Sequence, residues 1–367
     1  MSSREQWFRS IVSGQRRGPT AFAVRLLLRG ASVPYALAMR LRNRRYDRDP
    51  ARTVRVNIPV VSVGNLTLGG TGKTPCVELV AGMLRDDDFT VAILSRGYGA
   101  TGGVNDEAML LEDNLPDVPH LQGADRTMLA RTAMIELESE VLILDDGFQH
   151  RRLGRDLDIV LIDATEPWGY GRVFPAGMLR EPRRGLGRAN LIVLTRSDRV
   201  RPEVLASLED EVRTLAGATI LRSVHKPTML VSGDEVESPT VLNGQEVASF
   251  CGIADPANFR ATVRGLGAEI VGEMVFADHH AYTREDVDRL RAWAAGFPEH
   301  VKIVTTQKDI VKLRLADLAG RGLWYIRIGM SMNRADTETL RNRLRQMMNE
   351  TADTGEWPST DDWSERG

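Results

Sequence analysis

Residues 59–74 read PVVSVGNLTLGGTGKT, a short apolar run followed at once by a loop rich in glycine. The β-branched run predicts a buried strand, and the glycines permit a tight turn. Its end, Gly72-Lys73-Thr74, is that of a Walker A loop, where backbone N–H groups wrap a phosphate, lysine reaches the outer phosphate oxygens and the hydroxyl binds Mg²⁺. The helix that follows would add its positive end. The stretch predicts a nucleotide site at Thr67, Leu68, Gly69, Gly70, Thr71, Gly72, Lys73 and Thr74.

One position of this loop departs from the general pattern, which requires glycine where Thr67 stands. Gly69 and Gly70 lie inside the loop and supply the flexibility that the missing glycine would give. The prediction of a nucleotide site therefore stands. The alternative is a glycine-rich turn that binds nothing.

Outward from the loop, apolar runs at 91–94, 141–144, 159–162 and 191–194 alternate with helical patterns. Continuous apolar strands separated by helices are typical of a parallel sheet covered on both faces. The sequence thus predicts an α/β fold with a P-loop NTPase-like doubly wound sheet. Further runs at 247–250, 269–271, 301–305 and 324–326 predict a second, smaller α/β domain.

These elements suggest a division of the chain into parts. We expect a helical N-terminal arm, a P-loop domain, a linker rich in glycine, proline and asparagine, a smaller domain, a helix that returns to the first domain, and an acidic disordered tail. The corresponding residues are 1–50, 51–232, 233–244, 245–330, 333–349 and 350–367.

Composition narrows the class of protein. With 367 residues, 42% hydrophobic and 27% charged, the chain has the composition of about two globular domains. A net charge of −2 leaves no large positive field for a nucleic-acid backbone, so we expect no nucleic-acid partner. Two cysteines, Cys76 and Cys251, form no disulfide framework and favour a reducing compartment.

The N-terminal arm is basic and apolar at once. Residues 1–55 hold 13 Arg against three acidic residues, and apolar stretches at 21–28 and 33–39 are interrupted by Arg25 and Arg29. This pattern predicts a pair of amphipathic helices at a membrane surface, with apolar side chains at the acyl boundary and arginines at anionic head groups. The charges argue against a conventional spanning helix and against a cleaved signal peptide. The alternative is a helical hairpin packed on the protein.

A second part of the site is expected where the apolar run 141–144 ends in Asp145 and Asp146. Carboxylates at the C-terminal edge of such a sheet hold Mg²⁺ in P-loop proteins. The sequence therefore predicts Thr74, Asp145 and Asp146 as magnesium ligands. The alternative is a turn in which one aspartate caps a helix.

Several motifs occur together over about residues 20 to 345. In this combination the chain closely resembles the tetraacyldisaccharide 4'-kinases, the lipid A kinases. The motifs are the loop at 64–75, SRGYG at 95–99, DDGFQHR at 145–151, DLD at 156–158, PAG at 175–177 with LREP at 179–182, DHH at 278–280 and TTQKD at 305–309.

The resemblance implies ATP- and Mg²⁺-dependent phosphorylation of the 4'-hydroxyl of a tetraacyldisaccharide 1-phosphate, a membrane lipid. It also implies two α/β domains with a cleft between them, and an N-terminal segment on the inner membrane. We expect peripheral contact with the cytoplasmic face of the bacterial inner membrane, and the sequence indicates no obligate protein partner.

The resemblance also implies catalytic roles for three residues: Lys73, Asp106 as the base, and His279 as its partner. Asp106 matches the family's aspartate, although Asn105 replaces the usual glycine. We expect Asp106 and His279 on different domains, so that closure completes the site. From the residues alone, Asp106 reads as an ordinary loop acid, and residues 278–280 read as a divalent-metal site or as polar surface.

Substrate contacts are expected at Arg96, Tyr98, Gln149, His150 and Arg180. Arginine suits a phosphate. A surface ion pair is the alternative for Arg96, and a solvated charge run is the alternative for Arg180. Gln307 stands where the family usually has glutamate, and we assign it no role.

Two other functions compete with a kinase. One is a P-loop GTPase or metallochaperone-type nucleotide switch, to which Thr195-Arg196-Ser197-Asp198 gives loose support as a guanine-reading segment. The other is a membrane scaffold with a vestigial nucleotide site. Binding of GTP in preference to ATP would favour the first, and an unaffected Lys73→Ala variant would favour the second.

Overall fold

The computed structural model describes residues 3–97, 106–253, 255–278 and 280–353. These fall into two compact units, each described here by itself. The larger unit is drawn from Arg9–Gly103, Leu115–Val224 and Met330–Gly367. The smaller unit is drawn from Met1–Phe8, Val104–Asn114 and His225–Gly329.

The larger unit is built on a parallel sheet with the strand order β7-β6-β5-β1-β4-β2-β3. Its central strands are buried along their whole length, which is why they read as continuous apolar runs. The predicted doubly wound sheet is confirmed. The strands are β1 (Val60–Asn65), β2 (Val91–Ser95), β3 (His120–Gln122), β4 (Val141–Asp145), β5 (Leu157–Asp163), β6 (Leu191–Thr195) and β7 (Thr219–Ser232).

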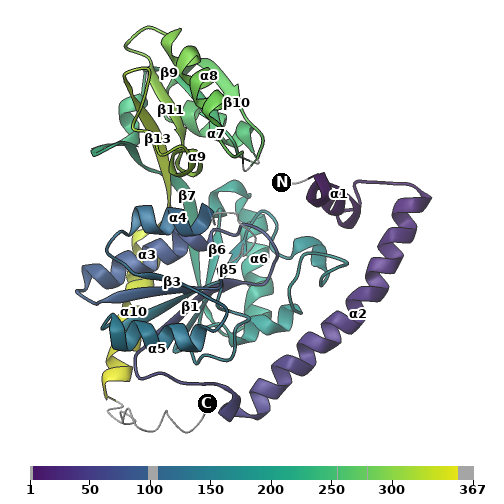
Figure 1. Ribbon diagram of the computed structural model, residues 1–367. Coiled ribbons are helices and arrows are strands. Elements are labelled where there is room, and N and C mark those ends of the chain that lie inside the picture. Colours follow the sequence, from purple (N-terminus) through teal and green to yellow (C-terminus); the bar gives the residue numbers. More distant parts are fainter. Residues whose placement is uncertain (1–2, 98–105, 254, 279, 354–367) are drawn as a thin grey trace. The chain divides into compact units, whose positions relative to one another are not determined.

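Helices cover both faces of this sheet, and α3 and α5 lie on opposite sides of it (Figure 1). Alternate strand residues face each side, so that Leu142 and Leu144 of β4 pack with Ala130 and Ala133 of α5. At one end, Asp87 pairs with Arg345 of α10 at 2.7 Å. The helices of this unit are α2 (Pro19–Arg48), α3 (Lys73–Asp86), α5 (Arg126–Glu136), α6 (Pro202–Leu215) and α10 (Arg334–Asp353), with α1 (Ser3–Val12) shared at the unit boundary.

Strand order places the glycine-rich loop. β1 lies between β4 and β5, so the loop after β1 leaves the sheet at the edge where those two strands also end. Ligands of open parallel sheets bind at this edge, where the order of the strands changes direction. The fold therefore brings the ends of β1 and β4 together.

The smaller unit has its own parallel sheet, β10-β9-β11-β13, with the second half of β7 beside β13. Alternate residues of β9 enter two separate cores, Val247 and Cys251 on one face and Ala248 and Phe250 on the other. Its elements are β8 (Glu235–Glu237), β9 (Glu246–Cys251), β10 (Glu269–Val275), β11 (Lys302–Thr306), β12 (Asp317–Leu318), β13 (Arg321–Met332), α4 (Asp106–Asn114), α7 (Pro256–Gly265), α8 (Arg284–Ala295) and α9 (Gln307–Leu313).

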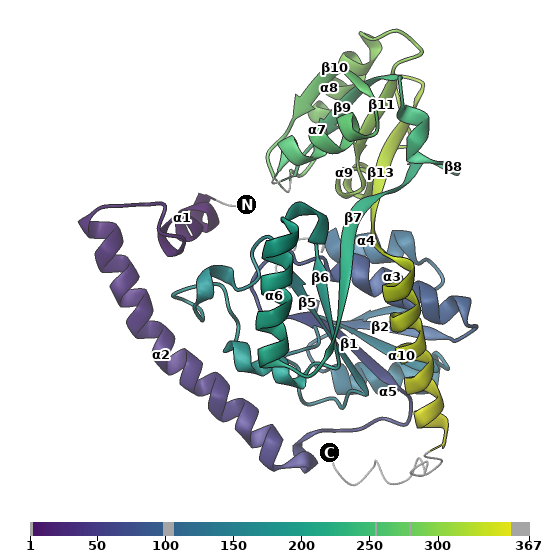
Figure 2. The same cartoon turned by 180° about the vertical axis from the view of Figure 1, so that it is seen from behind.

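The connection between the units differs from the predicted linker at 233–244. β7 runs unbroken from Thr219 to Ser232 and crosses the boundary after Val224, and β13 crosses back after Gly329 (Figure 2). Residues 233–244 lie inside the smaller unit. The sequence does not predict β7 as one strand, because His225, Lys226 and Pro227 interrupt its apolar pattern.

The grouping of α4 also differs from the prediction, which placed it in the P-loop domain. This helix comes from the first half of the chain, yet it belongs to the smaller unit. Gln307 of α9 donates to Asp113 and Asn114 of this helix, and hydrophobic periodicity does not reveal such contacts. Asp106 thus falls in the same unit as Asp278 and His280, whereas the sequence analysis expects the base and its histidine on different domains.

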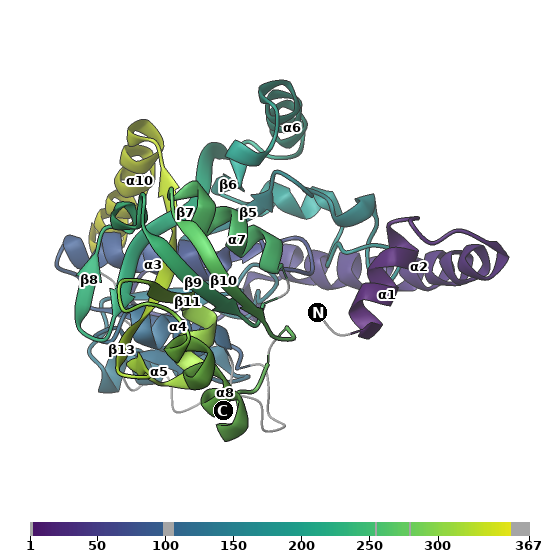
Figure 3. The same cartoon turned by 90° about the horizontal axis from the view of Figure 1, so that it is seen from above.

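The N-terminal arm contains one long helix, α2, where the sequence predicts a pair, as its unbroken course in Figure 3 shows. Pro34 lies inside it without ending it. One face of α2 is fixed to the larger unit: the Tyr35 hydroxyl donates to the Arg180 carbonyl at 3.0 Å, and the Asn43 amide donates to Glu181 at 2.7 Å. Within the described ranges, α2 is the one helix long and apolar enough to cross a membrane.

Candidate active site

The loop between β1 and α3 owes its shape to two glycines. Gly69 has a φ of 128° and Gly72 a φ of 89°, both in the left-handed region that side chains disfavour. Gly72 immediately precedes α3, so the first turn of that helix begins at Lys73. The N-terminal amides of the helix and the lysine are thereby presented together, as an anion site requires.

The loop accommodates threonine at position 67 because the backbone there does not adopt the positive φ that favours glycine. Thr67 is buried in a bridge with Leu179. The Asn65 side-chain amide donates to the Thr67 carbonyl at 2.8 Å, and the Leu68 N–H donates to the Met178 carbonyl at 2.7 Å. The chain around residue 179 therefore supports the loop that a glycine would otherwise leave flexible.

Two cations meet one carboxylate beside this loop. Lys73 Nζ lies 3.6 Å from Asp146 Oδ1, and Arg180 Nη1 lies 2.7 Å from Asp146 Oδ2. Burial by itself would raise the pKa of Asp146, but Lys73, Arg180 and Arg126 outweigh it and lower that pKa below its usual value. Asp146 is therefore ionised at neutral pH and holds both cations at the sheet edge.

Arg126, which the sequence analysis missed, shapes the acidic turn. It is buried on the first turn of α5 and donates to the carbonyls of Asp145 at 2.9 Å and Asp146 at 3.1 Å. Asp146 has a φ of 53°, a strained conformation that these two bonds help to hold. The only sequence signal is Asp125, which caps α5 immediately before it.

The residues present fit Mg²⁺. Asp146 Oδ1 is buried and accepts no hydrogen bond from the described residues, so it keeps a lone pair for an ion. Carboxylate and hydroxyl oxygens are the ligands Mg²⁺ prefers, with phosphate oxygens and water completing the shell. Asp145, Asp146 and Thr74 are the residues that would hold the ion. No group of three or more His, Cys, Asp or Glu capable of holding a metal occurs among the residues described.

Gln149 and Arg180, expected as substrate contacts, lie beside the loop and are partly used by the fold. Gln149 Nε2 donates to the Asn65 carbonyl at 2.9 Å and to Glu181 at 3.1 Å. Glu181 is fully buried and also pairs with Arg188 at 2.8 Å. Gln149 thus joins the end of β1 to the segment that carries Arg180.

His150 lies next to Gln149 in the same turn. Burial, followed by the positive charges of Arg126, Arg155 and Arg42, lowers its pKa to about 4. Its ring is therefore neutral at physiological pH. His150 Nε2 is buried without a hydrogen-bond partner in the described part of the chain.

Two further expected substrate residues follow β2. Arg96 is exposed just past the strand end, where loops of the nucleotide edge gather. Tyr98 lies outside the described residues.

The expected base and its partner belong to the smaller unit. Asp106 is the first residue of α4, and its side chain lies outside the described part of the chain. His279 also lies outside it. The neighbouring His280 has a structural place: its Nε2 lies 2.9 Å from Asp286, and its ring packs on Phe276 with centroids 4.9 Å apart.

Comparison with known proteins agrees with this geometry. A family model described as tetraacyldisaccharide-1-P 4'-kinase matches residues 24–349. The tetraacyldisaccharide 4'-kinase of Anaeromyxobacter sp. (strain K) is 41% identical over 89% of this chain and 90% of its own length. That of Geobacter metallireducens is 37% identical over 88% of this chain and 98% of its own length.

A solved structure is similar over the same range. The crystal structure of LpxK from Aquifex aeolicus in complex with ATP has a TM-score of 0.72 and 30% identity, and it covers 89% of this chain and 99% of that protein. A family match over most of the sequence, with relatives of similar length, settles the classification: the chain belongs to the tetraacyldisaccharide-1-P 4'-kinase family.

Proposed function

We propose that this protein transfers the γ-phosphate of ATP to the 4'-hydroxyl of a tetraacyldisaccharide 1-phosphate, giving the 4'-phosphorylated lipid A precursor. The observation that carries the proposal is the meeting of Lys73 and Arg180 on Asp146 beside the glycine loop. Phosphoryl transfer depends on positioning and charge neutralisation, and these cations can turn from the carboxylate to phosphate oxygens. Mg²⁺ bound at Asp145, Asp146 and Thr74 would supply further neutralisation.

The smaller unit would supply the proton acceptor. We assign Asp106 as the base that takes the proton of the attacking hydroxyl, with His279 orienting it and sharing the charge. Asp106 is the first residue of α4.

A direct assay tests the transfer. Incubation of the protein with labelled ATP, Mg²⁺ and a disaccharide 1-phosphate bearing four acyl chains is expected to give one labelled lipid, with the new phosphate mapped to the 4' position. Two controls are run: the disaccharide 1-phosphate without acyl chains as substrate, and the Lys73→Ala protein as enzyme. Label at another position, or turnover that GTP supports better than ATP without lipid stimulation, would overturn the proposal.

The nucleotide-switch alternative is not supported by the segment that suggested it. The Thr195 hydroxyl donates to the Thr71 carbonyl at 3.0 Å, and Arg196 pairs with Asp163 and donates to the Gly70 carbonyl at 3.0 Å. These side chains hold the phosphate loop instead of reading a base. The family match also favours the kinase.

We further propose that α2 places the enzyme on the cytoplasmic face of the inner membrane, where ATP is available. The face of α2 opposite Tyr35 and Asn43 carries an exposed apolar stripe, defined here as Phe22, Leu26, Val33, Leu37 and Leu41. Arg29, Arg40 and Arg44 are exposed beside it. Such a helix lies in the interface with its apolar side in the acyl boundary and its arginines at anionic head groups.

Charges placed in the apolar stripe are expected to release the protein from lipid. In Leu26→Glu/Leu37→Glu, each substitution removes roughly 1.5 kcal/mol of apolar burial, so partition onto anionic liposomes should fall on the order of 100-fold. Flotation measures the bound fraction. The matched control is Met128→Glu/Ile135→Glu, which places two charges at exposed apolar positions of α5. Equal loss in both variants, or none in either, would contradict a membrane role for the stripe.

A further inference from the structure

α9 carries two buried polar side chains that the transfer chemistry does not use. The helix follows β11 directly, with Thr306 as its N-cap. Gln307 and Asp309 are 8% and 0% exposed, although both belong to residue types that normally face water. Buried polar groups of this kind persist where they hold specific partners.

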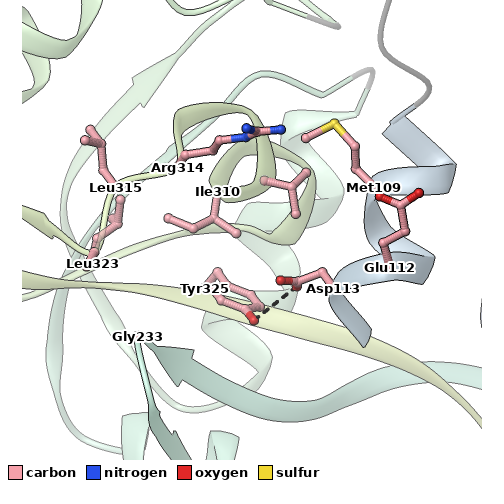
Figure 4. A pocket seen from close by; sticks show the side chains of 11 residues that line it. Met109, Glu112, Asp113, Gly233, Ile310, Arg314, Leu315, Leu323 and Tyr325 are labelled. Carbon is pink, nitrogen blue, oxygen red and sulfur yellow. Dashed lines mark hydrogen bonds between the residues drawn. The ribbon is translucent and has the colours of Figure 1, made fainter. Parts of the chain in front are cut away.

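Gln307 joins α9 to α4. Its amide nitrogen donates to Asp113 Oδ2 at 2.9 Å and to Asn114 Oδ1 at 2.5 Å. The Tyr325 hydroxyl reaches the same Asp113 oxygen at 3.5 Å, at the edge of a 410 Å³ cavity between α4, α9 and β13 (Figure 4). The last turn of α4 is therefore held by these hydrogen bonds as well as by the buried Leu111, with open space beside it.

The amide at 307 suits this partner. A glutamine side chain has two N–H donors, whereas a carboxylate has none at neutral pH. A glutamate at 307 would set a second negative charge against Asp113 at hydrogen-bond distance and leave it without its donor. Gln307 and Asp113 thus form a matched pair.

Asp309 holds a different segment. Its Oδ1 accepts from the Gly252 N–H at 3.0 Å and from the Tyr282 hydroxyl at 2.9 Å. The Tyr282 ring packs against Phe276 and His280 with centroids 5.1 and 5.0 Å apart. A side chain at Gly252 would come within 3.2 Å of Tyr282 and Ala277, so this position admits only glycine without a shift. Asp309 thus ties the first turn of α9 to Tyr282 and to the backbone at Gly252.

We propose that α9 is a positioning element of the proton-accepting site: Asp309 anchors its first turn to Gly252 and Tyr282, and Gln307 in the same turn sets α4, the helix that begins at Asp106. The inference rests on the role proposed above for Asp106. Gln307 acts through the helix that it holds.

The test exchanges the amide and the carboxylate between positions 307 and 113 in the full-length enzyme. Gln307→Glu is expected to lower kcat about 10- to 100-fold, since small misplacements of reacting groups have effects of this order, while the KM for ATP stays near the native value. Asp113→Asn in the Gln307→Glu background restores the donor between positions 113 and 307 and should recover most of kcat. The matched control is Gln245→Glu, the same substitution at an exposed position of this unit, which should leave kcat unchanged.

A second cycle separates positioning from general loss of structure. In an Asp106→Asn background, Gln307→Glu should lower kcat only slightly further, because the carboxylate that Gln307 positions is already absent. Additive losses, or no recovery with Asp113→Asn, would overturn the inference. If Gln307→Glu unfolds, Gln307→Met removes the hydrogen bonds without adding charge, and full activity of that variant would also overturn it. Failure of Asp106→Asn to slow turnover would instead refute the proposed base.

Discussion

Replacing Lys73 by alanine is expected to lower turnover roughly 10²- to 10³-fold, the loss typical of removing one group that stabilises developing charge in the transition state. Lys73 is the cation at the start of α3, and it lies over Asp146 at the position where the outer phosphates of ATP would bind. Arg180 stays on the other oxygen of Asp146, so the fold should be retained. Initial rates with labelled ATP measure the effect.

The same variant carries a second readout. Burial raises the pKa of Asp146, and Lys73 is the strongest of the charges that outweigh this effect. Without Lys73 that pKa rises. The proposed magnesium role needs Asp146 in its ionised form, so the acid limb of the pH-rate profile should move to higher pH. The matched control is Lys226→Ala, at an exposed lysine of β7. Native turnover in Lys73→Ala would support a scaffold with a vestigial site and contradict a kinase.

Asp106→Asn is expected to lower turnover about 10²- to 10⁴-fold, the range typical of a lost general base, while ATP affinity stays near the native value. Nucleotide affinity is spared because residue 106 belongs to the smaller unit and the glycine loop to the larger one. Single-turnover rates and equilibrium ATP binding measure the two quantities.

Two further variants sharpen this result. Glu112→Gln removes an exposed carboxylate from the same helix and should leave turnover unchanged. His279→Ala should resemble Asp106→Asn, and the double variant should be little worse than the poorer single one, because residues that act as a unit are not additive. ATP affinity that falls as steeply as turnover in both single variants would contradict the assignment.

The strands and the phosphate loop could be predicted from the sequence. For the strands, the reason is that burial on both faces of the sheet requires apolar residues at successive positions. β1, β4 and β6 are buried at every position, so their apolar runs are unbroken. The loop could be predicted as well, since the left-handed turn at Gly72 admits few residues besides glycine.

The parts that could not be predicted depend on polar contacts between distant residues. α4 lies in the smaller unit, where its Asp113 accepts a hydrogen bond from Gln307, almost 200 positions away. No local sequence pattern predicts such a bond. Arg126 holds the acidic turn through backbone carbonyls, which every residue has. The apolar stretches at 21–28 and 33–39 suggested two helices, but α2 runs through both.

In the proposed membrane-bound state, the attachment of α2 sets the distance between the glycine loop and the lipid. Tyr35 and Asn43 fasten the helix to Arg180 and Glu181, and Arg180 also reaches the carboxylate that holds Lys73. In the membrane-bound state proposed above, with the apolar stripe among the acyl chains, the attached helix fixes the height of the glycine loop above the bilayer. On this proposal, a substrate whose head group protrudes to that height can react without leaving the membrane.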